Sequence, residues 1–247
     1  MLTFDENKHA YSFDGKPMIG TTSVLSVIAK PNLIQWSANE ACKYLDNVRN
    51  SFVEDAGIPP KEYLIFNPEK FDIALNEAKT AHRRKKEDAG TKGTDIHKEI
   101  EIIIKGAIAM DGYLPADIQR GKLQIQNFLS WAKENNVKFL ASEKQVYNLE
   151  YWYAGTLDFL CQIGGKIYLG DVKTSSGIWP EHWLQTSAYQ LALESMRDDW
   201  RIDGHIIVNL KKTGEIDVKE SFAYDTNVKG WLASLMLYKV LNNLPTN

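Results

Sequence analysis

The sequence predicts an α/β or α+β fold in which helices pack on a mixed central sheet, with a helical region at the N-terminus. The first observation is a change of pattern, because helical apolar spacing prevails up to about residue 135 and alternating spacing follows. From residue 137 the expected order is strand–strand–strand–helix–strand–strand–helix. The second observation is a hairpin near residues 153–173, whose two apolar runs are joined by Gly164-Gly165, a dipeptide suited to a two-residue turn.

Length and composition are ordinary for a globular protein. The chain has 247 residues, of which 44% are hydrophobic and 25% are charged. This length suits one large domain or a core with an appended subdomain. We expect residues 1–90 to form an N-terminal hairpin and helical region packed on a core of residues 91–247.

Charge and cysteine content narrow the classes of function. The net charge of -3 gives no global basic field, so binding of nucleic acid would depend on the local charge of a groove. Cys42 and Cys161 lie far apart, and two thiols cannot supply a four-cysteine zinc or iron–sulfur site. The N-terminus does not resemble a signal peptide, and no run of about 18 apolar residues occurs. We therefore expect a soluble, intracellular protein.

The first ninety residues are expected to contain a hairpin followed by helices. Residues 1–20 are typical of a small hairpin, and Thr21-Thr22-Ser23 predicts the start of a short helix. In the helix after it, Trp36 is either a core residue or an aromatic platform for a base. Residues 50–67 contain two consecutive prolines and are expected to be irregular.

A long helix is predicted to begin at Pro68 and to end at Gly90, and its later part is basic. Four consecutive cations occur there: Arg83, Arg84, Lys85 and Lys86. They form either a solvated helix face or a ridge that grips phosphates, where charge neutralisation would dominate the affinity.

His97 lies near the start of the next predicted helix, after Gly90 and Gly93. It borders an apolar stripe made of Ile96, Ile100, Ile103 and Ile104. The histidine is therefore either a packed or surface residue, or a ligand. The two glycines could let the N-terminus of this helix approach a phosphate.

The remaining elements follow from apolar spacing. Helices are predicted over 117–135, 180–197 and 225–241, and strands over 137–149, 153–163, 167–172, 202–210 and 215–222. Glu143 lies in the first of these strands.

Two carboxylates and a lysine lie on the predicted hairpin. Asp158 is in its first strand, and Asp171 and Lys173 end the second. Antiparallel neighbours lie about 5 Å apart, so the carboxylates can meet at one end of the sheet and share a divalent cation. Lys173 faces the same side as Asp171, because side chains alternate with period two. This arrangement predicts a metal site with an adjacent ammonium, suited to hydrolysis of a phosphodiester.

An acidic residue two positions before a lysine is a weak signal by itself. It recurs at four other places: Glu6–Lys8, Asp14–Lys16, Glu77–Lys79 and Asp217–Lys219. Only Asp171–Lys173 follows a partner strand with its own aspartate and precedes a polar loop and a helix rich in aromatic and amide groups.

Four segments taken together resemble the PD-(D/E)XK nuclease superfamily, in particular its RecB-like branch. They are the glycine-led segment from Gly93 to His97, Gly-Thr-Leu-Asp at 155–158, Asp-Val-Lys-Thr-Ser at 171–175, and Gln185-x-x-x-Tyr189. The resemblance implies a restriction-endonuclease-like αβββαβ core with a mixed central sheet. Since the flanking cysteines that bind an iron–sulfur cluster in some members are missing, the chain is more similar to the cluster-free exonucleases that phages encode.

The resemblance also implies a role for each matching residue. The ligands of Mg²⁺ or Mn²⁺ would be His97, Asp158, Asp171 and the backbone carbonyl of Val172. Lys173 would position or deprotonate the attacking water, or stabilise the charge that develops on phosphorus. Gln185 and Tyr189 would hold either the DNA backbone or this lysine. Glu143 would act behind these ligands or on a second metal, unless it is only an exposed strand residue.

The function that the resemblance implies is that of a metal-dependent DNA exonuclease. Its partners would be linear duplex ends or single strands of DNA and a single-strand annealing or recombination protein. The setting would be recombination or repair in the cytoplasm of a bacterial or phage-infected cell. Two alternatives stay open: a structure-specific endonuclease with the same site, and a catalytically inactive protein that binds DNA ends.

Overall fold

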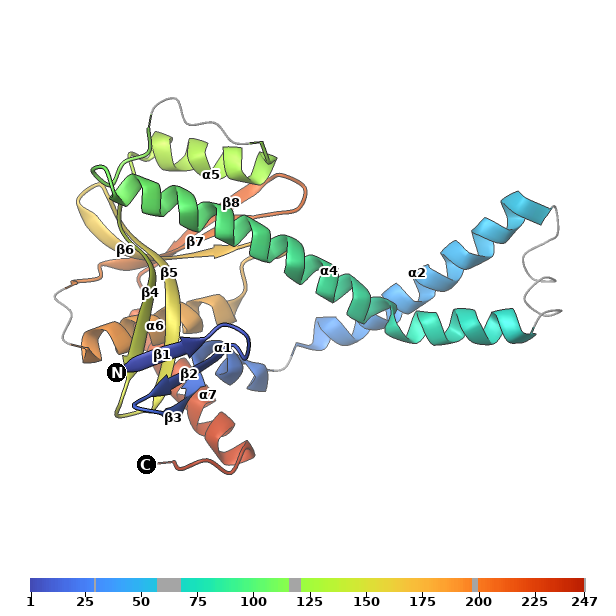
Figure 1. Ribbon diagram of the computed structural model, residues 1–247, viewed down its shortest axis with the longest axis horizontal. Coiled ribbons are helices and arrows are strands. Elements are labelled where there is room, and N and C mark those ends of the chain that lie inside the picture. Colours follow the sequence, from blue (N-terminus) through green and yellow to red (C-terminus); the bar gives the residue numbers. More distant parts are fainter. Residues whose placement is uncertain (29, 57–67, 116–120, 197–199, 247) are drawn as a thin grey trace. The chain divides into compact units, whose positions relative to one another are not determined.

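The structure is a computed structural model that describes residues 1–28, 30–56, 68–115, 121–196 and 200–246 (Figure 1). The chain forms two compact units, one made of residues 1–28 with 95–247 and the other of residues 29–94. This division differs from the expected one at residues 90 and 91, because residues 1–28 belong to the unit that contains the sheet. Within the described ranges, no helix combines the length and the apolar character that a membrane crossing requires.

The strands of the described residues form one mixed sheet. In sheet order they are β1 (Leu2–Asp5), β2 (Ala10–Phe13), β3 (Lys16–Gly20), β5 (Tyr153–Ile163), β6 (Lys166–Lys173), β7 (Gly204–Leu210) and β8 (Ile216–Ser221), with β4 (Lys138–Asn148) paired to β5. β3 is parallel to β5 and β6 is parallel to β7, whereas the other neighbours are antiparallel. The prediction of a mixed central sheet is therefore confirmed.

The hairpin between β5 and β6 has the predicted turn. Ile163 ends the first strand and Lys166 begins the second, so that Gly164 and Gly165 alone connect them. Their φ angles are 56° and 84°, in the left-handed region that favours glycine in two-residue turns.

The N-terminal strands form a three-stranded meander, so the prediction of a hairpin over residues 1–20 missed β3. This strand pairs with β5 only through Ile19 and Gly20, opposite Tyr153 and Ala154. Because its partner lies more than a hundred positions along the chain, the local sequence carries no sign of the pairing. After β3 the predicted short helix is present as α1 (Thr21–Val24) and a 3-10 turn, η1 (Leu25–Val27).

Strand β5 pairs with three other strands. β4 runs along one edge of β5 from Tyr153 to Gln162. The opposite edge is shared, with β3 beside the first two residues and β6 beside residues 159–163. Residues 155–158 lie between these two pairings, and the candidate site is built at this interval.

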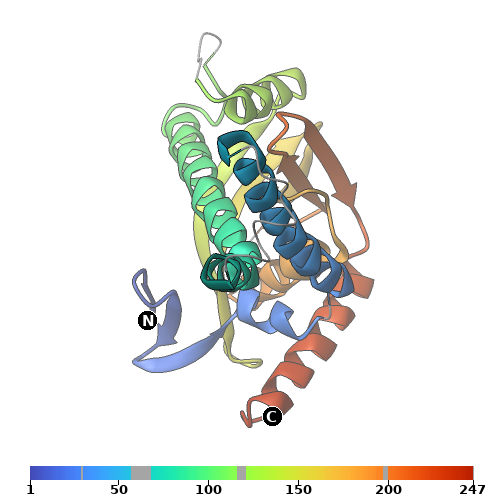
Figure 2. The same ribbon diagram turned by 90° about the vertical axis from the view of Figure 1, so that its right-hand side faces the viewer.

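Helices cover both faces of the sheet and give three layers. One face packs on residues 95–108 of α4 (Pro68–Ile108) and on α5 (Leu123–Glu134), and the other on α6 (Pro180–Ser195) and α7 (Tyr224–Leu241). Figure 1 shows α5 and the end of α4 above the sheet and α6 below it. Phe159 and Cys161 pack on the first face and Leu160 on the second, as alternation along a strand requires. α7 and the N-terminal strands lie at the same lower end of this unit in both Figure 1 and Figure 2.

The second unit consists of α2 (Pro31–Ala56) and the first part of α4. The predicted end of a helix at Gly90 is wrong, because α4 continues through Gly90 and Gly93 to Ile108. Both glycines have helical backbones, and a glycine inside a helix costs only about 1 kcal/mol relative to alanine. The prediction of an irregular stretch at 50–67 is wrong for residues 50–56, since α2 extends to Ala56, and residues 57–67 lie outside the described residues.

Candidate functional site

The site lies where β5 and β6 separate. Their last backbone pair is Phe159 with Gly170, and Asp158 and Asp171 are the next positions on the two strands. Beyond this point the backbone N–H of Val172 donates to Asp158 Oδ2 at 2.7 Å instead of to a strand carbonyl. The side chain of Asp158 thus accepts a backbone hydrogen bond at the position where the β-ladder ends. Both carboxylates lie at this point of separation.

Two glycines allow the close approaches on which this geometry depends. A Cβ atom on Gly170 would lie 2.0 Å from the ring of Phe159, its partner across the ladder. A Cβ atom on Gly155 would lie 2.5 Å from the ring of Tyr189. Gly155 therefore lets Tyr189 on α6 lie directly against β5, within the interval that neither β3 nor β6 covers.

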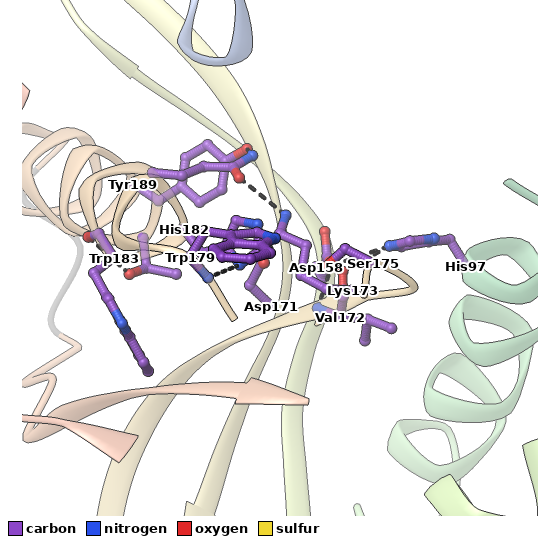
Figure 3. A network of polar contacts seen from close by, with 12 residues as sticks. His97, Asp158, Asp171, Val172, Lys173, Ser175, Trp179, His182, Trp183 and Tyr189 are labelled. Atoms are coloured by element: carbon purple, nitrogen blue, oxygen red, sulfur yellow. Dashed lines mark hydrogen bonds and ion pairs between the residues drawn. The ribbon is translucent and has the colours of Figure 1, made fainter. Parts of the chain in front are cut away.

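A chain of polar contacts starts at Asp171 and ends on α6 (Figure 3). Lys173 Nζ lies 2.7 Å from Asp171 Oδ2 and donates to Gln185 Oε1 at 2.9 Å. Gln185 in turn donates from Nε2 to the hydroxyl of Tyr189 at 2.7 Å. The lysine is thereby held between a carboxylate and an amide, and its ammonium has a defined position.

Burial strengthens the charge interactions among these polar contacts. Asp171 is 1% exposed and Lys173 is 19% exposed, so their charges attract each other with little screening by water. Burial raises the pKa of Asp171, although the Lys173 ammonium opposes the rise and the Asp158 carboxylate adds to it. Burial also raises the pKa of Tyr189 well above its usual value, so this residue stays a neutral phenol.

His97 reaches the site from α4. Its Nε2 atom lies 2.7 Å from the carbonyl oxygen of Val172 and 4.0 Å from Asp158 Oδ2. The interpretation of His97 as a purely packed residue does not describe this position, because its side chain is half-buried and directed at the separated strands (Figure 3).

Glu143 lies beside Asp158 on the neighbouring strand. The flanking pairs are Ser142 with Phe159 and Lys144 with Leu157, so the register places Glu143 opposite Asp158. Its φ angle of 49° is uncommon for a residue with a side chain, and such conformations gather at functional sites. Burial, together with the carboxylates of Asp158 and Glu101, raises the pKa of Glu143 to about 7. The interpretation of Glu143 as an ordinary exposed residue is therefore wrong, since it is half-buried among other acids.

These donors suit a hard divalent cation in kind. Carboxylates and a carbonyl are the ligands that Mg²⁺ prefers, and one imidazole adds tolerance of Mn²⁺. Among the described side chains, no group of three or more His, Cys, Asp or Glu lies close enough together to hold a metal ion. A cation would have to draw the donors together, and it would relieve the carboxylate repulsion that adds to the effect of burial on the pKa of Glu143.

A buried histidine fixes the part of α6 that carries Gln185 and Tyr189. His205 on β7 contacts Thr186 Oγ1 through Nδ1 at 3.0 Å and Gln190 Oε1 through Nε2 at 2.7 Å. These partners directly follow Gln185 and Tyr189 in sequence and lie one helical turn apart. The sequence analysis missed His205, and the only signal for it was a histidine inside an apolar strand.

Tyr11 is a second residue that sequence analysis missed. It lies on β2, and its hydroxyl is 2.9 Å from the hydroxyl oxygen of Thr156, within the open interval of β5. Burial raises the pKa of Tyr11, and the nearby Glu143 carboxylate adds to the rise. No signal near Tyr11 in the sequence predicts this position, because β2 reaches the site through the unpredicted strand β3.

The four cations considered for DNA binding belong to the second unit, on the first part of α4. Arg83 lies 3.9 Å from Glu87, Arg84 lies 2.5 Å from Glu77, and Lys85 lies 2.7 Å from Glu40. Lys86, the fourth, is exposed. With three of the four paired to carboxylates, the run is closer to a solvated, ion-paired helix face than to a free phosphate ridge.

Comparisons with known proteins place no family on this chain. No family model matches the sequence, and no curated protein matches it. Fifteen chains of solved structures match, among them the protein SSO0001, with 19% identity and a TM-score of 0.30. That match covers 47% of this chain and 57% of SSO0001, so this chain spans little more than half of that protein. A TM-score of 0.30 does not define a common fold.

Proposed function

We propose that this chain is a nuclease that hydrolyses phosphodiester bonds of DNA with Mg²⁺ or Mn²⁺, and that it acts as an exonuclease. The observation that carries the proposal is the convergence of His97, Asp158 and the Asp171–Lys173 pair at the point where β5 and β6 separate. Acidic and imidazole donors beside a buried ammonium supply both a cation site and a positive group for a phosphate.

The order of elements supports the same class. A helix precedes three consecutive strands, then a helix and a further strand follow, as α4 or α5, β4–β5–β6, α6 and β7. This order supports the αβββαβ core that the resemblance to the PD-(D/E)XK nucleases implies, and we propose that the chain belongs to that superfamily. The carboxylates and the lysine lie on β5 and β6, the second and third of the three consecutive strands.

Each side chain has a defined task in the proposed reaction. A divalent ion held by Asp158, Asp171, His97 and the Val172 carbonyl would polarise the phosphate and acidify a bound water. Lys173, fixed by Gln185, directs its ammonium at the charge that develops on phosphorus. Tyr189 holds the amide of Gln185, so that the lysine does not lose its position when the substrate arrives.

The test is digestion of end-labelled linear DNA with Mg²⁺ or Mn²⁺. We expect Asp171→Ala and Lys173→Ala each to reduce the rate by about 100-fold or more, since both remove a group that acts at the reacting phosphate. The chain offers a matched control, because Asp217-Val218-Lys219 on β8 repeats the tripeptide outside the site. Asp217→Ala and Lys219→Ala should keep the wild-type rate. Activity that survives in both site variants contradicts the proposal.

One further substrate and one binding measurement separate the alternatives. A covalently closed circle has no end, so its cleavage identifies a structure-specific endonuclease with the same site. Binding of DNA ends without cleavage under any divalent ion identifies an inactive binding protein.

A further inference from the structure

An exposed tryptophan stands beside the candidate site and takes no part in its chain of polar contacts. Trp179 directly precedes α6, and its side chain is 42% exposed. Exposed apolar residues are common and need no explanation when they are scattered. Trp179 is different, because it lies in sequence between Lys173 and the helix whose Gln185 holds that lysine.

The segment that carries Trp179 closes on itself at the site. It leaves β6 at Lys173 and returns with Gln185, and these two residues are joined by the hydrogen bond of 2.9 Å. Trp179 lies six residues from each end of this closed segment, and its backbone N–H donates to His182, which is three positions before Gln185 and next to it on the surface of α6. Figure 3 draws Trp179 with His182, Asp171 and Lys173 in one close view.

The indole is held in place from one side. Its six-membered ring lies against Gly177, where an added Cβ atom would be 3.4 Å from the ring. The backbone N–H of Trp179 donates to His182 Nδ1 at 3.2 Å, and Ser175 Oγ closes the loop onto the carbonyl of Gly177 at 2.6 Å. The backbone that carries the ring is thus held by hydrogen bonds before any ligand arrives, which lowers the entropic cost of stacking on the ring.

We propose that Trp179 stacks on a nucleobase next to the scissile phosphate and thereby selects an unpaired strand. This inference rests on the proposed function and names its substrate class. Bases inside a duplex have both faces covered by their neighbours, whereas an unpaired base offers a face to an aromatic ring. Base–aromatic stacking tolerates any sequence, because every base has a π-face.

Binding in the absence of divalent metal tests the inference without relying on catalysis. Fluorescence anisotropy compares a labelled oligothymidine with an abasic strand of equal length, which has the same phosphates but no bases. We expect Trp179→Ala to weaken oligothymidine binding about tenfold and to leave abasic binding unchanged. Trp179→Phe should restore much of the loss, because a phenyl ring also stacks.

Phe222→Ala provides the matched control. Phe222 is 59% exposed and lies near Gly204 and Tyr168, at the end of β6 opposite to Asp171. The Phe222→Ala substitution removes an exposed aromatic ring without changing the site. The affinities for oligothymidine and for the abasic strand should therefore stay at the wild-type values. Circular dichroism melting of each variant verifies that it folds.

The outcomes separate this inference from the proposed function. Equal oligothymidine affinity in wild type and Trp179→Ala overturns the stacking role, and so does an equal loss on both strands. If the base-dependent loss is found but the wild type cleaves no DNA with Mg²⁺ or Mn²⁺, the stacking site stands and the nuclease proposal fails.

Discussion

Among single residues, the pair formed by Lys173 and Asp171 links stability to the proposed chemistry. Both charges are largely withdrawn from water, at a desolvation cost that their attraction offsets only while both are present. Removing the lysine leaves a carboxylate that is 1% exposed without its cation. Removing both charges avoids that penalty.

We expect Lys173→Met to lower the free energy of unfolding by about 3 kcal/mol, because an uncompensated buried charge remains. The double variant Lys173→Met with Asp171→Asn should be more stable than Lys173→Met alone. Urea denaturation at neutral pH with a chelator measures all four members of this cycle. Additive effects of the two substitutions would show that the pair is not coupled.

Part of the residue-level site could be predicted from the sequence. Alternation with period two places Lys173 and Asp171 on one side of β6, and the contact of 2.7 Å agrees with it. The need for glycine at 155 could not be predicted, because the ring that would collide there, Tyr189, belongs to another element. The strained φ of Glu143 is likewise set by neighbours distant in sequence.

At the level of elements, α4 differs most from its prediction. The sequence favours a break at Gly90, yet the helix passes through it in a helical conformation. The local preference of a glycine is weak, amounting to about 1 kcal/mol, and continuous packing on either side can outweigh it.

Gly90→Ala distinguishes a helical Gly90 from a Gly90 that ends a helix. An added Cβ atom would meet nothing within 4 Å, so the substitution should stabilise the protein by about 0.5–1 kcal/mol. Thermal unfolding measures the change. If Gly90 ended a helix in a left-handed conformation, alanine would destabilise the protein instead.

The packing of α6 on β7 should depend on pH through His205. Burial lowers the pKa of this histidine to about 4, well below the usual value of about 6.5. As the pH falls, the unfolded chain binds the proton first, so the contribution of neutral His205 to stability is complete above pH 6.5 and is lost progressively as the pH falls towards 4.

Comparison with His205→Gln isolates this effect. Between pH 7.5 and 5 the wild type should lose about 2 kcal/mol more of its free energy of unfolding than the variant does. Urea denaturation at the two pH values measures the difference, with His9→Asn as the control, since His9 is exposed in the turn between β1 and β2. Equal pH dependence in wild type and His205→Gln would contradict the buried, neutral state of this side chain.

For the whole molecule, binding of the proposed cation should stabilise the folded state. An ion that binds the folded chain alone stabilises it by about 2.7 kcal/mol at a hundred times its dissociation constant. We therefore expect Mn²⁺ to raise the melting temperature of the wild type and to leave that of Asp171→Asn unchanged. Asp217→Asn, at the repeated tripeptide, should respond as the wild type does. An equal response of Asp171→Asn and the wild type would place the ion elsewhere.

The sequence by itself determined the local features of this protein, whereas the tertiary structure decided how they meet. The turn at Gly164-Gly165, the strands around it and the shared side of Asp171 and Lys173 follow from backbone preferences and from alternation, which act over a few residues. The pairing of β3 with β5, the approach of His97 to the Val172 carbonyl and the hold of His205 on α6 join residues far apart in sequence. Such contacts depend on how whole faces pack, and no short stretch of sequence encodes that packing.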